Sequence, residues 1–160
     1  MHAPDLFPPK LAAAIRQLAA CASGLRPDAL VDIEQVPGCW RLSITPKVSQ
    51  ACPLELLLLA DQKFDLSVGG ELYEDQPLTD LDLFPKLVVA VANGDVITRR
   101  WASPVTGLAH SVETIIGAEQ VPLWRGEQIN AFAADSLTRE ASLRRDRRYV
   151  PYHRGANRKL

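Results

Sequence analysis

The residues whose types and spacing could support catalysis lie around His110. This histidine is followed by Ser111 and Glu113 in a stretch rich in apolar and β-branched residues. A serine, a histidine and an acid can together form a nucleophilic triad. Adjacent residues of a strand point to opposite faces of a sheet, however, so His110 and Ser111 cannot meet through local geometry. We therefore expect a half-exposed strand histidine and assign no catalytic residue.

Five carboxylates lie within the twelve residues 71–82. They are Glu71, Glu74, Asp75, Asp80 and Asp82. Their oxygens suit Mg²⁺ or Ca²⁺, but the spacing lacks the central glycine and the terminal glutamate of an EF-hand loop. We interpret the cluster as a solvated loop followed by charges that favour a helix N-terminus. The chain also contains no P-loop and no H-E-x-x-H motif. We predict no cofactor, and the sequence leaves open whether this acidic loop holds a metal.

Two groups of basic residues suggest binding rather than catalysis. Arg99, Arg100 and Trp101 lie together in a predicted strand and, with His110, could contact an anion or an aromatic ligand. Exposed cations on a strand also guard a sheet against edge-to-edge aggregation. The second group lies in the C-terminal sequence RRDRRYVPYHRGANRKL. We predict that a partner contacts its residues Arg144, Arg145, Arg147, Arg148, Tyr149, Tyr152 and Arg154.

The charge of the chain is divided unevenly between its body and this C-terminus. Residues 1–138 contain 10 Lys and Arg against 17 Asp and Glu, which gives a net charge of −7. Residues 139–160 contain 8 against 2, which gives +6. Such an asymmetry is typical of an interaction tail. It predicts docking on an acidic surface of another protein or on the acidic body of a second copy.

Nucleic acid is the alternative partner for the same basic tail. Arginine neutralises phosphate, and tyrosine rings such as those of Tyr149 and Tyr152 can stack on the bases of a single strand. The chain contains no RNP, KH or zinc-finger pattern, however. A third interpretation is a basic terminus without a specific role.

Composition predicts a cytoplasmic globular protein. The 160 residues are 47% hydrophobic and 23% charged, values that are ordinary for such a domain. Cys21, Cys39 and Cys52 include no CxxC pair, which argues against a disulfide framework or a zinc site. No apolar run approaches the roughly 20 residues of a membrane span, and the N-terminus does not resemble a signal peptide. We expect reduced thiols and no membrane partner.

The first half of the chain predicts a helix followed by strands. An alanine-rich helical pattern begins after Pro8 and ends at Ser23 and Gly24. Alternating and apolar patterns predict strands at residues 29–36, 39–45, 54–60 and 64–68, with a loop at 71–77. The strand at 54–60 is almost entirely apolar, which predicts that both of its faces are buried.

The second half centres on a helix that leads directly into a β-hairpin. Apolar residues recur at helical spacing up to Ala92, with Asp82 as the N-cap and Gly94 as the terminating residue. The expected hairpin strands are 96–102 and 108–116, followed by a loop at 117–126 and a final helix from about Glu127 to Arg147.

These elements predict one α+β domain over residues 1–148 and an irregular basic tail over 149–160. The expected order is α-β-β-β-β-α-β-β-α, with helices packed on a largely antiparallel sheet of about six strands. Leu57 and Leu87 should be buried where the sheet meets the central helix. The order resembles that of the dimeric type III secretion chaperones in layout alone, without a shared motif. Those proteins are usually strongly acidic, whereas this chain carries −1, and layout does not establish function, so we assign no family.

The absence of a catalytic motif and the charge asymmetry lead to one functional hypothesis. We expect a non-enzymatic protein-binding or adaptor module that docks another protein, or a second copy in a homodimer, through its basic C-terminus. Two alternatives stay open. The first is a nucleic-acid-associated protein that uses the tail, and the second is a small enzyme built around His110, Arg100 and the acidic loop.

Overall fold

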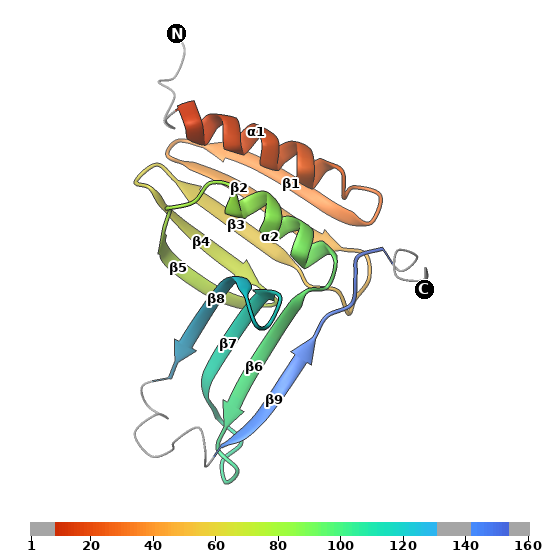
Figure 1. Cartoon of the computed structure of the whole chain (residues 1–160), viewed down its shortest axis with the longest axis vertical. Coiled ribbons are helices and arrows are strands. Elements are labelled where there is room, and N and C mark those ends of the chain that lie inside the picture. Colours follow the sequence, from red (N-terminus) through yellow and green to blue (C-terminus); the bar gives the residue numbers. More distant parts are fainter. Residues whose placement is uncertain (1–8, 131–141, 154–160) are drawn as a thin grey trace.

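Figure 1 shows the computed structural model, which describes residues 9–130 and 142–153. In these ranges two helices accompany nine strands, arranged in two antiparallel sheets with the orders β1-β2-β3-β4-β5 and β8-β7-β6-β9. The elements are α1 Pro9–Ser23, β1 Ala29–Val36, β2 Cys39–Pro46, β3 Leu54–Leu59, β4 Lys63–Val68, β5 Glu71–Pro77, α2 Leu83–Ala92, β6 Val96–Ala102, β7 Ala109–Gly117, β8 Pro122–Ile129 and β9 Leu143–Arg148. The α+β class is confirmed, whereas the expected single sheet of about six strands is wrong.

Local patterns predicted most of the elements before residue 117 correctly. The hairpin of β1 and β2 turns at Gly38, whose φ of 77° suits a glycine. Asp82 occupies the N-cap position of α2, although its side chain makes no capping hydrogen bond. Gly94 follows α2 with a φ of 80°, as expected of a residue that ends a helix. The hairpin of β6 and β7 also forms as predicted.

The core lies between the first sheet and the two helices, which pack against the same face of that sheet (Figure 1). Phe84 of α2 meets Phe64 of β4 edge to face, with 5.1 Å between ring centroids. Leu87 is buried as predicted. Leu57 is only partly buried, because β3 alternates between the helix-covered face and the open face. The prediction that both faces of β3 are buried is therefore wrong.

The expected loops and the expected final helix differ most from the structure. Residues 71–77 form edge strand β5 instead of an acidic loop, and Pro122–Ile129 form β8 where a loop and a helix start were expected. The segment Leu143–Arg148, placed in the final helix by its sequence, is strand β9. Main-chain pairing with β6 decides its conformation, since no apolar pattern within LRRDRR marks it as a strand. The part of the expected helix at residues 131–141 lies outside the described residues.

The resulting order of elements also departs from the α-β-β-β-β-α-β-β-α layout. Five strands precede α2 and four follow it in the described residues. The layout on which the likeness to type III secretion chaperones depended is therefore not the one observed.

Tyr73 of β5 forms one buried contact between the two sheets. Its hydroxyl donates to Oγ1 of Thr114 on β7 at 2.7 Å, and its ring meets Trp124 of β8 edge to face at 4.9 Å between centroids. Gly126 lies beneath both rings, and a Cβ there would come within 2.6 Å of the Tyr73 ring. The absence of a side chain at Gly126 thus lets the second sheet approach the edge of the first.

Residues 149–152, which we call the C-terminal strap, form a second contact between the sheets. Tyr149 is 6% exposed and its hydroxyl lies 3.3 Å from Oγ1 of Thr98 on β6. Tyr152 is 3% exposed and donates from its hydroxyl to the carbonyl of Cys52. The expected irregular tail therefore begins with residues that belong to the core.

Cys52, which accepts this hydrogen bond through its carbonyl, is itself buried. Burial raises the pKa of the Cys52 thiol to about 12, which keeps it protonated.

Candidate functional site

The two neighbouring arginines of β6 point to opposite faces of the second sheet. Arg99 is 9% exposed, and its guanidinium donates to Asp146 of β9 at 3.1 Å and to Glu119 at 2.5 Å. Arg100 is exposed and donates to Glu71 of β5 at 2.6 Å. Trp101, on the same face as Arg99, is 8% exposed. The expected exposed cation pair is therefore wrong, because alternation along the strand buries one of its members.

Asp146 is the centre of an ion-pair network on the Arg99 face. Arg144 lies two residues away on the same face of β9 and donates to both of its carboxylate oxygens, at 3.1 and 2.9 Å. These hydrogen bonds, together with those from Arg99, hold the pKa of Asp146 well below its usual range. Arg148 lies 3.9 Å from Glu119. Arg99, Arg144 and Arg148 on this face thus each lie close to a carboxylate of the same molecule.

The residues around His110 are enclosed rather than exposed. His110 is 4% exposed, and its Nε2 shares a hydrogen bond with the hydroxyl of Ser142. Glu113 is 1% exposed, and Nη2 of Arg125 lies 2.8 Å from its Oε1, an ion pair without the alignment of a hydrogen bond. The expected half-exposed histidine is therefore wrong. Pairing of β7 on both edges, with β6 and β8, places these side chains in the middle of the second sheet.

Strand β9 forms an edge of the second sheet. It pairs with β6, and all six of its residues are exposed. Four of them are the arginines predicted to meet a partner, so the segment Leu143–Arg148 carries a charge of +3. Arg147 lies over the ring of Tyr149 at 4.9 Å. Arg145 has no carboxylate within ion-pairing distance in the described residues.

A pocket of about 260 Å³ brings together the two groups of arginines that the sequence singled out. It lies at the β6–β7 hairpin end of the second sheet and is lined by Arg100, Ala102, Ser103, Gly107, Ala109, Leu143 and Arg145. Arg100 and Arg145 are direct partners in the antiparallel register of β6 and β9, so they share a face. The sequence pattern predicted a helix at Arg145 and therefore did not indicate this pairing.

The tyrosines predicted to contact a partner are not available on the surface. Tyr149 and Tyr152 are buried in the C-terminal strap, as described above. Arg154, the remaining member of that predicted group, lies outside the described residues. No Phe, Tyr or Trp side chain of residues 9–130 or 142–153 is exposed, whereas the imidazole of His153 is exposed and lies 3.1 Å from Oδ1 of Asp28. The described surface therefore offers charge to a partner but no exposed Phe, Tyr or Trp ring for stacking.

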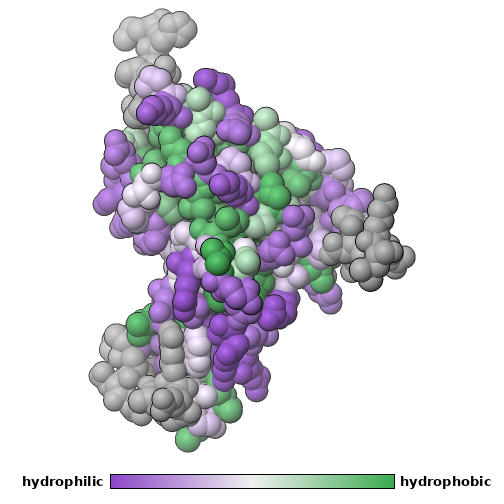
Figure 2. Space-filling model, in the orientation of Figure 1, coloured by the Kyte–Doolittle hydropathy of each residue, from purple (hydrophilic) through white to green (hydrophobic). Residues whose placement is uncertain are grey.

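Charge follows the division of the molecule into two sheets. Residues 9–95, which hold the first sheet and both helices, contain 7 Lys and Arg against 12 Asp and Glu, a net charge of −5. Residues 96–130 with 142–153, which hold the second sheet, contain 7 against 4, a net charge of +3. Figure 2 shows hydrophilic residues along the β9 side of the second sheet. The uneven charge along the sequence thus corresponds to an acidic first sheet with its helices and a basic second sheet.

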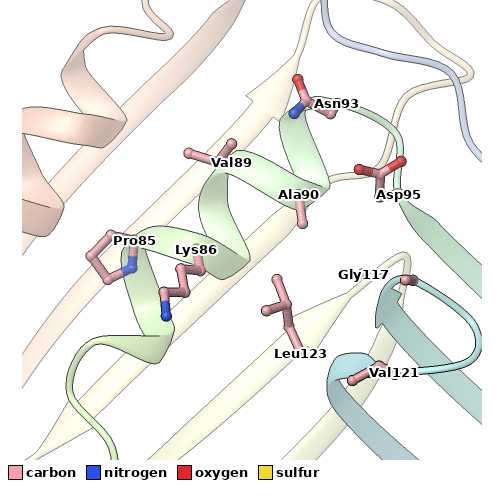
Figure 3. Close-up of a pocket in the computed structure, with 10 residues that line it drawn as sticks. Pro85, Lys86, Val89, Ala90, Asn93, Asp95, Gly117, Val121 and Leu123 are labelled. Carbon is pink, nitrogen blue, oxygen red and sulfur yellow. The ribbon is translucent and has the colours of Figure 1, made fainter.

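A second concave surface, of about 550 Å³, lies between α2 and the segment from Gly117 to Leu123. Figure 3 shows Leu123 projecting towards Ala90 of the helix, with Val121 on the same side of the groove as Leu123. The groove is mainly apolar, and Val121 is 79% exposed. Lys86 and Asp95 lie at different ends of it in Figure 3 and have opposite charges. The lining therefore has no net charge and does not favour one class of ligand.

The acidic residues of 71–82 do not gather into one site. Glu71 pairs with Arg100, while Oδ1 of Asp80 accepts the main-chain N–H of Asp82 at 3.0 Å. No group of three or more His, Cys, Asp or Glu in the described part of the chain is placed to hold a metal ion.

Comparison of the chain with protein-family models, curated proteins and solved structures gave no significant match. Neither helix in residues 9–130 and 142–153 is long and apolar enough to cross a bilayer. The arginine-rich edge strand β9 is the feature of the described surface whose charge points to a definite class of partner, an acidic one.

Proposed function

We propose that this chain is a non-enzymatic binding protein that docks an acidic, extended segment of another protein along strand β9. The observation that carries this proposal is the edge strand Leu143–Arg148, whose six residues are all exposed and carry +3. An exposed edge offers unpaired main-chain groups to an added strand. Its arginines disfavour pairing with neutral or basic strands and select an acidic one.

The enclosed position of the polar residues on β7 supports a binding role over a catalytic one. His110 and Glu113 are each at least 96% buried and engage Ser142 and Arg125. A catalytic acid or base has to reach a substrate proton at hydrogen-bond distance. These two side chains are closed off from a substrate in this conformation.

The position of the aromatic side chains favours a protein partner over nucleic acid. Sequence-tolerant binding of single strands combines phosphate contacts with bases stacked on exposed rings. Here Tyr149 and Tyr152 are buried, and Arg147 is stacked on the ring of Tyr149. The basic strand retains charge for an acidic partner but lacks the stacking surface.

The edges of the two sheets favour a different protein over a second copy. The exposed side chains of β1 include Asp32 and Glu34, which could complement the arginines of β9. Pairing of β9 with β1 of a second copy would join two different edges, and such head-to-tail contacts build open chains unless they close into a ring. We therefore assign the β9 edge to an acidic segment supplied by another polypeptide.

A labelled peptide tests this function. A fluorescent peptide of about eight residues that alternates Glu and Val should bind to the protein, and the matching Gln and Val peptide should bind at least about tenfold more weakly. Raising the salt from about 50 to about 300 mM should weaken the complex, because it shortens the screening length. Amides of residues 143–148 should gain hydrogen-exchange protection when the Glu peptide binds.

Two variants with equal charge change provide the control. Changing Arg144, Arg145, Arg147 and Arg148 to Gln should abolish binding of the Glu peptide. Changing the exposed cations Arg16, Lys47, Lys63 and Lys86 to Gln should leave it within about threefold. Circular dichroism and thermal unfolding show whether both variants fold. Equal losses in the two variants, or tighter binding of a uridine oligonucleotide of about 20 residues than of the Glu peptide, would contradict the proposed function.

A further inference from the structure

The pocket at the hairpin end of the second sheet places two like charges side by side. Arg100 and Arg145 face each other directly in the register of β6 and β9. Like charges at directly opposite positions destabilise a sheet. Glu71 offsets one of them through its 2.6 Å contact with Arg100, and Arg145 has no ion-pair partner in the described residues. The three side chains together therefore carry one uncompensated positive charge.

The pocket also contains a hydroxyl that is held in place by its own loop. Ser103 is 8% exposed, and its Oγ accepts the main-chain N–H groups of Val105 and Thr106, each at 3.2 Å. A hydroxyl that accepts from two neighbours still has its own proton to donate. Ser103 thus adds a positioned donor to the guanidinium groups of Arg100 and Arg145 in a space of about 260 Å³.

We propose that this pocket seats one carboxylate of the docked segment, held between Arg100 and Arg145. The proposal rests on the proposed function for the source of the carboxylate. One carboxylate neutralises the single remaining positive charge, whereas a phosphate dianion would exceed it. Guanidinium groups bind carboxylates through paired N–H donors. The pocket thereby selects Asp or Glu at one position of the partner segment.

The site lies where a side chain of an added strand can reach it. A strand docked beside β9 would lie about 5 Å beyond it. Its side chains on the face of Leu143 and Arg145 would lie beside the part of the pocket that these two residues line. Long side chains on one face reach diagonal neighbours on the adjacent strand. A glutamate of the docked segment can therefore pass beside Arg145 towards Arg100.

An amide-resolved NMR titration tests the pocket without the peptide. The probe is N-acetylglutamate amide, which presents one side-chain carboxylate, and its glutamine counterpart is the neutral control. The carboxylate should shift the amides of residues 102–109 and 143–145, and the neutral control should not. Arg145→Gln should remove these shifts. Arg148→Gln, an equal charge change on the opposite face of β9, should keep them.

The peptide assay separates failure of the pocket from failure of the proposed docking. Arg145→Gln should weaken binding of the Glu and Val peptide about tenfold, and Arg148→Gln less than about threefold. Equal losses in these variants would overturn the pocket while the docking proposal stands. Shifts produced by N-acetylglutamate amide in a protein that does not bind the peptide would support the pocket and overturn the docking. Tighter binding of inorganic phosphate than of N-acetylglutamate amide would overturn the carboxylate assignment.

Discussion

Gly94 has to lack a side chain for two reasons, its backbone conformation and its contact with a segment distant in sequence. Its φ of 80° lies in the left-handed region that ends α2. The C-terminal strap passes directly beside it, so that a Cβ would lie 2.8 Å from the carbonyl oxygen of Tyr149 and 2.9 Å from the carbonyl carbon of Val150. Gly38 has nearly the same φ, 77°, but a Cβ there meets no atom within 4 Å.

Replacement of these two glycines by alanine separates backbone strain from steric contact. Gly38→Ala should lower the free energy of unfolding by about 1–2 kcal/mol, the cost of a left-handed conformation for a residue with a Cβ. Gly94→Ala should cost about 1–3 kcal/mol more, because the new methyl group meets main-chain atoms that have to move. Urea denaturation of both variants measures the difference. Equal costs would mean that the strap does not press against Gly94.

Strand β3 shows how the position of the helices determines burial within an element. Five of its six residues, Leu54–Leu59, are leucines, and the remaining residue is Glu55. Leu56 and Leu58 are at most 2% exposed beneath the helices, whereas Leu57 faces the open side of the sheet and is partly exposed. Composition alone does not distinguish the two faces of such a strand, because leucine occupies both.

Neighbouring leucines of β3 should therefore respond differently to truncation. Leu58→Ala should lower the free energy of unfolding by about 2–5 kcal/mol, since it removes fully buried atoms and leaves a cavity. Leu57→Ala should cost less than about 1.5 kcal/mol, because its side chain is already in part exposed to water. Urea midpoints of the two variants, compared at equal m-values, provide the measurement. A larger loss for Leu57→Ala would show that another layer covers this face.

At the scale of the whole molecule, two of the contacts that join the sheets are built from buried tyrosines. Tyr73 connects β5 to β7 and β8, and the C-terminal strap connects the first sheet to α2 and β6. In the strap, the N–H of Tyr152 donates to the carbonyl of Ala92 at 2.8 Å, and that of Val150 to the carbonyl of Gln50 at 3.2 Å. The same short segment thus follows the arginine-rich β9 and secures that strand to the core.

Truncation tests the structural role of the strap. A chain ending at Arg148 lacks Tyr149 and Tyr152, and its free energy of unfolding should be at least about 3–5 kcal/mol lower than that of a chain ending at His153. The chain ending at His153 is the reference because it keeps the whole strap. Binding of a hydrophobic dye should rise in the shorter chain as the junction between the sheets opens. Equal unfolding free energies of the two chains would show that the strap is not part of the core.

The sequence alone determined the elements whose signals are local. Helical spacing up to Ala92 with Gly94 behind it, and the turn at Gly38 between two alternating runs, specify their conformations through neighbours in the chain. The separation of charge between body and C-terminus was also visible in the sequence, because charge does not depend on folding.

Only the tertiary structure decided the roles of the C-terminal residues. Leu143–Arg148 became a strand because β6 offers it a ladder of hydrogen bonds, and no local pattern within LRRDRR encodes that partner. The same pairing set Arg145 opposite Arg100 and turned Arg144 towards Asp146. Tyr149 is buried, and not exposed as the sequence suggested, because it lies in the junction between the two sheets. These outcomes depend on contacts between residues distant in sequence, and such contacts exist only once the chain has folded.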